Sequence, residues 1–65
     1  MKFEVQDMTC AHCVSRITQT VKDLDASATV EVDLESKQVK VSSQVSAGDV
    51  QHAIAEAGFS PTLTE

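Results

Sequence analysis

The chain of 65 residues switches between two spacings of apolar residues, and the order of these switches restricts the fold more than any other feature. Residues 2–7 alternate between apolar and polar side chains, which is typical of a half-buried strand. Residues 8–11 interrupt the alternation and are expected to form a loop. From His12 or Cys13 to about Leu24 the spacing becomes helical, which predicts an amphipathic helix. Its expected inward positions are Val14, Ile17, Val21 and Leu24.

The rest of the chain continues with a hairpin, a second helix and a last strand. Residues 28–34 and 39–43 alternate on either side of the polar stretch Glu35–Gln38, a pattern that predicts a hairpin. Helical spacing returns from about Ala47 to Ala57. Residues 61–65 are expected to form a short last strand, because their proline suits the start or the edge of a strand.

Capping residues mark both ends of the second predicted helix. Ser46, followed three residues later by Asp49, resembles a capping box with Asp in place of Glu. Gly58 is expected to end the helix, since glycine readily adopts the left-handed conformation found just after a helix. The boundaries of this helix are therefore predicted from local chemistry as well as from spacing.

The order β-α-β-β-α-β predicts an α+β, ferredoxin-like open-faced sandwich, with a four-stranded antiparallel sheet and two helices on one face. We expect residues 2–7 to lie beside residues 39–43, and residues 28–34 beside residues 61–65. The chain has no linker or low-complexity segment, so residues 1–65 are expected to form a single domain. Hydrophobic residues make up 42% of it, enough for one layer of helices on one sheet.

Cys10 and Cys13 are the only cysteines, and they lie close together in the stretch "MTCAHC". A disulfide between them would close too short a loop to stabilise the fold appreciably. No apolar segment reaches the length that spans a membrane, so we expect a soluble, cytoplasmic protein whose thiols stay reduced. The cysteine pair therefore indicates metal or redox chemistry.

The predicted place of these cysteines, at the start of the first helix, favours thiolates. Thr9 is the expected N-cap, and the free N–H groups that follow it attract negative charge. Two thiolates with no evident third ligand suit a soft ion of low coordination number, above all Cu(I). Structural zinc normally takes four ligands, so a zinc site would need Asp7, a histidine, water or a second molecule.

The charged residues argue against a nucleic-acid-binding function. The net charge is −5, and the five basic residues form no patch in the sequence. The acidic balance either steers docking to a basic partner or only maintains solubility. Arg16 and Lys22, both on the first predicted helix, either offset the charge of a bis-thiolate site or are solvated. The basic residues are Lys2, Arg16, Lys22, Lys37 and Lys40.

The stretch "MTCAHCV" after a first strand, together with "EAGF" at the end of the second helix, resembles the heavy-metal-associated domains and their M-x-C-x-x-C motif. The resemblance covers essentially the whole chain. It implies that Cys10 and Cys13 are the metal ligands and that Met8 is the motif methionine. The chain departs from the family where Asp7 replaces a usual glycine, and where Phe59 stands in place of the tyrosine of many bacterial chaperones.

Several side chains near the motif have both a metal-related and a plain structural interpretation. Met8 is a third ligand or, as we expect, an anchor that packs the loop on the core. His12 is expected to be solvent-exposed, although a role as a ligand stays open. Phe59 is expected in the core, where the resemblance also places it near the thiols as a shield. His52 is expected on the exposed face of the second helix.

These features predict a soluble Cu(I) metallochaperone without enzymatic activity. The resemblance implies that it passes copper by thiolate exchange to a copper-transporting P-type ATPase, or to the metal-binding domains of one, in a transient heterodimer. The alternatives are a metal-binding domain excised from such an ATPase, which Phe59 favours, and a zinc- or mercury-binding relative. A thiol oxidoreductase is disfavoured, because the chain is too short for a thioredoxin-like site. Two sites together supply four sulfurs, which leaves a metal-bridged homodimer open.

Overall fold

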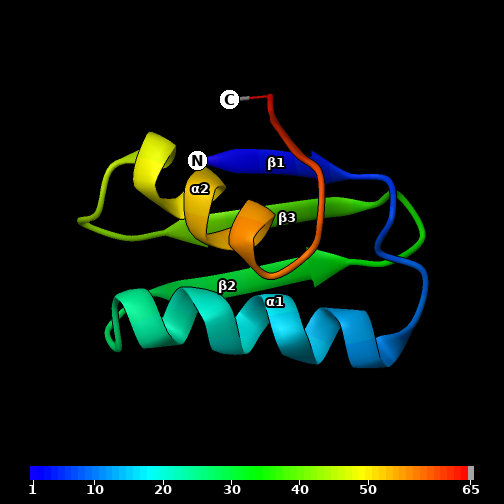
Figure 1. The fold of residues 1–65 in the computed structure, drawn as a ribbon, viewed down its shortest axis with the longest axis horizontal. Coiled ribbons are helices and arrows are strands. Elements are labelled where there is room, and N and C mark those ends of the chain that lie inside the picture. The colour runs from blue at the N-terminus through cyan, green and yellow to red at the C-terminus, as the bar shows by residue number, and fades with distance from the viewer. Residues whose placement is uncertain (65) are drawn as a thin grey trace.

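The computed structural model describes residues 1–64, and these residues adopt the expected ferredoxin-like α+β fold (Figure 1). Strands and helices follow one another in the order β-α-β-β-α-β. Glu65, which was expected in the last strand, lies outside the described residues. The elements are β1 (Lys2–Val5), α1 (Ala11–Leu24), β2 (Thr29–Asp33), β3 (Gln38–Ser42), α2 (Ala47–Glu56) and β4 (Pro61–Leu63).

The four strands form one antiparallel sheet in the order β2-β3-β1-β4. β1 pairs with β3, as expected, and its Phe3 lies opposite Val39. The expected pairing of the second and fourth strands is wrong, because β2 and β4 occupy the two opposite edges. The hairpin places β3 between β1 and β2, and α2 then returns the chain to the free side of β1. β1 is therefore central, and the loop that follows it leaves from the middle of the sheet.

One face of the sheet is buried under the two helices, which pack against each other (Figure 1). Alternate residues of the central strands point inward, and no polar or charged residue of the described chain is buried. Leu24, expected to face inward, is instead 42% exposed, because it is the last residue of α1 and lies where the helix ends. The core consists of Phe3, Val5, Met8, Ile17, Val21, Ala28, Val39, Val41, Val50 and Ile54.

Both predicted caps of α2 are confirmed. The Ser46 side chain accepts a hydrogen bond from the Asp49 N–H at 3.2 Å. At the other end Gly58 has a φ of 101°, and its N–H and that of Phe59 donate to carbonyls of the last helical turn. This pair of bonds is a Schellman motif. It turns the chain back so that Phe59 packs, half-buried, against the core.

Hydrogen bonds join three connecting segments at one end of the sheet. The Val5 N–H donates to the Lys37 carbonyl at 2.9 Å, which ties the end of β1 to the β2–β3 turn. The Ser60 N–H donates to the Asp7 carboxylate at 3.2 Å, which ties the α2–β4 loop to the segment after β1. The segment that carries Cys10 therefore lies between two other loops. No helix within residues 1–64 combines the length and the apolar character needed to span a membrane.

Candidate metal centre

Cys10 and Cys13 lie at the N-terminal end of α1, one helical turn apart. Cys10 is itself the N-cap, with extended backbone angles, so the expectation of Thr9 as N-cap is wrong. Its side chain makes no capping hydrogen bond, and the first helical bond runs from the Val14 N–H to the Cys10 carbonyl. Since a cap with an oxygen side chain is lacking, the partial positive charge of the helix start faces the sulfur atoms.

The two sulfur atoms lie 3.5 Å apart as free thiols. Cys10 is exposed and Cys13 is half-buried, so the pair opens directly to solvent. Within residues 1–64, no group of three or more His, Cys, Asp or Glu side chains is placed to hold a metal ion. The donor set is therefore two soft sulfurs at the surface, which suits a thiophilic ion of low coordination number better than zinc.

The surroundings of Cys13 favour its thiolate form. Hydrogen bonding from the Thr9 backbone, and then from the Cys10 thiol, lowers the pKa of the Cys13 thiol, against a smaller opposing effect of burial. Thiolate is the form that binds metals and reacts as a nucleophile. Thr9 therefore contributes to the site through its backbone and does not act as a helix cap.

Met8 anchors the cysteine loop in the core, as expected. Its side chain is fully buried among the core residues contributed by the sheet and the helices. Because the thioether is enclosed there, the structure gives Met8 a packing role at the base of the loop. Its backbone carbonyl stays available and accepts a hydrogen bond from the Lys37 ammonium at 2.8 Å.

Asp7 takes part in the same loop. Its carboxylate accepts the Ser60 N–H bond described above and so joins the cysteine loop to the α2–β4 loop. The carbonyl of Met8, the next residue, accepts a hydrogen bond from Lys37 in the β2–β3 turn. The segment before Cys10 is thus tied from two directions.

Both basic residues of α1 donate hydrogen bonds to backbone carbonyls. The Arg16 guanidinium donates to the Ala57 carbonyl at 3.0 Å and lies 5.9 Å from the centre of the Phe59 ring, so its charge faces the C-terminal end of α2. The Lys22 ammonium donates to the Ala28 carbonyl at 2.6 Å, near the far end of α1. Lys22 lies nine residues beyond Cys13, about 13 Å along a helix, which excludes close charge compensation.

Both histidines are exposed, as expected. His12 lies in the first turn of α1, beside the cysteines in the sequence. His52 lies on the outer face of α2, where its Nε2 is 3.1 Å from a carboxylate oxygen of Glu56. Neither histidine joins Cys10 and Cys13 in a cluster of metal-binding side chains within residues 1–64.

Lys37 is the residue that sequence reasoning missed. It was grouped with scattered basic residues, yet its ammonium reaches the carbonyl of Met8, 29 positions earlier in the chain. Its φ of 62° is also unusual for a residue with a side chain. The sequence carries no local signal for this contact, because a lysine in a polar turn is ordinarily solvated.

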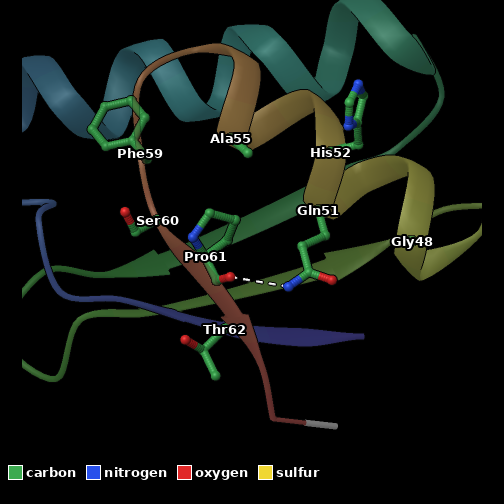
Figure 2. A pocket seen from close by; sticks show the side chains of 8 residues that line it. All are labelled: Gly48, Gln51, His52, Ala55, Phe59, Ser60, Pro61 and Thr62. Carbon is green, nitrogen blue, oxygen red and sulfur yellow. Dashed lines mark hydrogen bonds between the residues drawn. The ribbon is translucent and has the colours of Figure 1, made fainter.

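One groove of the surface is distinct from the cysteine pair. It has a volume of about 560 Å³ and runs between α2 and β4, where the Gln51 amide donates to the Pro61 carbonyl at 3.0 Å (Figure 2). Neither cysteine lines it. The candidate metal centre is therefore an exposed site on a loop, open to a second protein, and is separate from this groove.

Comparison with known proteins identifies relatives over nearly the whole chain. The model of the heavy-metal-associated domain matches residues 2–60. The copper chaperone CopZ of Bacillus subtilis is 37% identical over 60 residues, which cover 88% of this chain and 87% of that protein. The copper chaperone Atx1 from Synechocystis PCC6803 superposes with a TM-score of 0.93 at 35% identity, over 95% of this chain and 98% of that chain. A crystal structure of a gold-binding protein superposes with a TM-score of 0.92 at 41% identity, over 94% of each chain.

Proposed function

Because the chain belongs to the heavy-metal-associated domain family, we propose that it is a soluble copper chaperone that carries Cu(I) on Cys10 and Cys13. The observation that carries this proposal is the pair of exposed sulfurs 3.5 Å apart at the start of α1. The similarity to chaperones named for copper, over nearly the full length of each chain, supports the choice of metal.

The two sulfurs hold the ion, and the fold keeps the site accessible. Cu(I) prefers soft thiolate ligands and accepts a low coordination number. Cys10 is exposed, so a thiolate of a partner protein can bind the ion before either sulfur of this chain leaves. One copper–sulfur bond then forms to the partner as one to this chain breaks, and the charge of the ion does not change. The released thiolate stays near the helix N-terminus, which stabilises its negative charge.

The partner class follows from this exchange. It is a protein with its own accessible cysteine pair, and we assign it to a copper-transporting P-type ATPase or the metal-binding domains of one. The complex is transient, because exchange requires that the two proteins separate after transfer, and it forms in the cytoplasm, where thiols stay reduced. The chain acts as a carrier and catalyses no reaction of its own. An insulin-reduction assay on the metal-free protein checks this last point, and robust turnover would contradict it.

A competition titration tests the proposed site. The protein is titrated with Cu(I) under anaerobic conditions against a chromophoric Cu(I) chelator. Replacing both Cys10 and Cys13 by Ser is expected to abolish competition, whereas the control Ser15→Ala, an exposed position on the same helix, is expected to compete like the unmodified protein. If the double variant holds copper as tightly as the unmodified chain, the assignment of the site is wrong.

Gold is a second candidate cargo, favoured by the 41% identity to the gold-binding protein. The same two sulfurs suit any soft, thiophilic monovalent ion. Metal analysis of protein isolated from cells grown with both metals separates the two cargoes. A stoichiometric content of copper supports the chaperone proposal, and gold in its place would reassign the cargo while leaving the ligands unchanged.

A further inference from the structure

We propose that Lys37 is a positioning residue for the metal loop, defined here as residues 7–10. The hydrogen bond from its ammonium to the Met8 carbonyl orders this loop and thereby raises the affinity of the two sulfurs for a bound ion. The proposal rests on the proposed function for the nature of the ion. It adds a residue from a distant turn to a site built otherwise from one loop and one helix.

Lys37 is attached to this region at both its backbone and its side chain. Its carbonyl accepts the N–H of Val5, the last residue of β1, at 2.9 Å. Its ammonium donates to the Met8 carbonyl at 2.8 Å, from a partly buried position. The Met8 N–H in turn donates to the Val5 carbonyl at 3.2 Å. Lys37 therefore bridges the start and the middle of the turn that leads to Cys10.

The backbone of Lys37 adopts a conformation that is sterically unfavourable for a residue with a side chain. Within residues 1–64 it is the one non-glycine residue with a positive φ, at 62°. A glycine would adopt this conformation without steric cost, so a lysine there needs compensation. Strain of this kind persists where the surrounding structure requires the residue, and it points to function. The bond to the Met8 carbonyl is the compensation that the structure supplies.

The contact reaches the sulfurs through one rigid peptide group. The carbonyl of Met8 and the N–H of Thr9 belong to the same planar unit, so holding the oxygen also sets the direction of the N–H. Thr9 directly precedes Cys10, the N-cap of α1, so the orientation of this peptide unit bears directly on the residue that carries the first sulfur. A cation fixed on this oxygen further polarises the N–H on the other side of the plane.

Three substitutions separate positioning from simple stability. Lys37→Met keeps the length of the side chain but removes the ammonium, and Lys37→Arg keeps a cationic donor. Lys37→Gly removes the side chain and also relieves the backbone strain. Lys40→Met is the matched control, because it makes the same change in net charge from an exposed position on β3, opposite Glu31 of β2.

The first measurement uses the metal-free protein and does not depend on copper. Amide hydrogen exchange and ¹⁵N relaxation of Thr9 and Cys10 report the order of the metal loop. We expect faster exchange at both residues in Lys37→Met and Lys37→Gly, with exchange close to that of the unmodified protein in Lys37→Arg and Lys40→Met. Unchanged exchange in Lys37→Met would overturn the proposal.

The second measurement is Cu(I) affinity in competition with a chelator, alongside the melting temperature. We expect Lys37→Met and Lys37→Gly to bind roughly tenfold more weakly, the low end of losses seen when groups that orient metal ligands are removed. Lys37→Gly should lose affinity without a fall in melting temperature, because relief of strain offsets the lost bond. An equal loss in Lys40→Met, or no recovery in Lys37→Arg, would overturn the proposal. If the unmodified protein binds no copper, the proposed function is wrong. The hydrogen-exchange measurement on the metal-free protein still tests whether Lys37 orders the metal loop.

Discussion

Replacing Met8 tests most directly whether this residue is an anchor or a ligand. Its side chain is fully buried in the core, so truncation to alanine leaves a cavity. Substitutions of this kind cost about 2–5 kcal/mol. A domain of 65 residues has a total stability of about 3–10 kcal/mol, so Met8→Ala should be only marginally folded. A loss of about 3 kcal/mol corresponds to a fall of roughly 12–24 °C in melting temperature for a domain of this size.

Met8→Leu is the informative partner of this variant. Leucine keeps the volume and the apolar character but has no sulfur, so the cost in stability should stay below about 1.5 kcal/mol. If Met8 only packs, the Cu(I) affinity of Met8→Leu should equal that of the unmodified protein. Thermal unfolding followed by circular dichroism gives the first quantity, and chelator competition gives the second.

Two results would refute the reasoning about Met8. If Met8→Leu loses as much Cu(I) affinity as Cys10→Ser, the thioether is a ligand and its burial does not describe the loaded state. If Met8→Ala costs less than about 1 kcal/mol, the loop does not depend on this anchor. Either outcome would show that the burial of Met8 in the core does not explain why a methionine stands at this position of the motif.

Three further predictions concern the framework around the site. The Asp25 carboxylate accepts hydrogen bonds from Ser43 and Ser27, which lower its pKa from 3.8 to about 2, so it stabilises the fold fully above about pH 4 and loses this contribution as the pH falls toward 2. In Asp25→Asn, the free energy of unfolding should therefore fall less steeply between about pH 4 and pH 2, as followed by circular dichroism. An unchanged pH dependence would show that Asp25 is not its source. Gly58→Ala should lower the melting temperature by roughly 4–16 °C, because an L-residue at φ 101° costs about 1–2 kcal/mol, whereas Gly48→Ala inside α2 should not lower it; equal effects would argue against backbone strain. Arg16→Ala should cost roughly 1 kcal/mol through the lost contacts with Ala57 and Phe59, measured by urea unfolding, while leaving Cu(I) affinity unchanged; a large loss of affinity would instead give Arg16 a role at the site.

Local patterns in the sequence determined the kinds of element and their order. Alternation over residues 2–7 and helical spacing up to Leu24 predicted β1 and α1, because each spacing puts apolar side chains on a single face. Ser46 and Gly58 predicted the ends of α2, since capping depends on residues within one turn of the helix terminus. The inward position of Met8 was also predictable, from the need to attach a short loop to a small core.

Only the tertiary structure decided which segments meet. Periodicity shows which face of a strand is buried but does not name its neighbours, so the edge positions of β2 and β4 were missed. Thr9 was misassigned because the start of a helix depends on how the chain leaves the preceding strand. The contacts of Lys37 with Met8 and of Asp7 with Ser60 join residues 29 and 53 positions apart, and no local pattern encodes them. The sequence alone thus determined which side chains carry the sulfurs, whereas packing of three loops at one end of the sheet decided how those sulfurs are held, because loop contacts form only once the core has fixed where each strand ends.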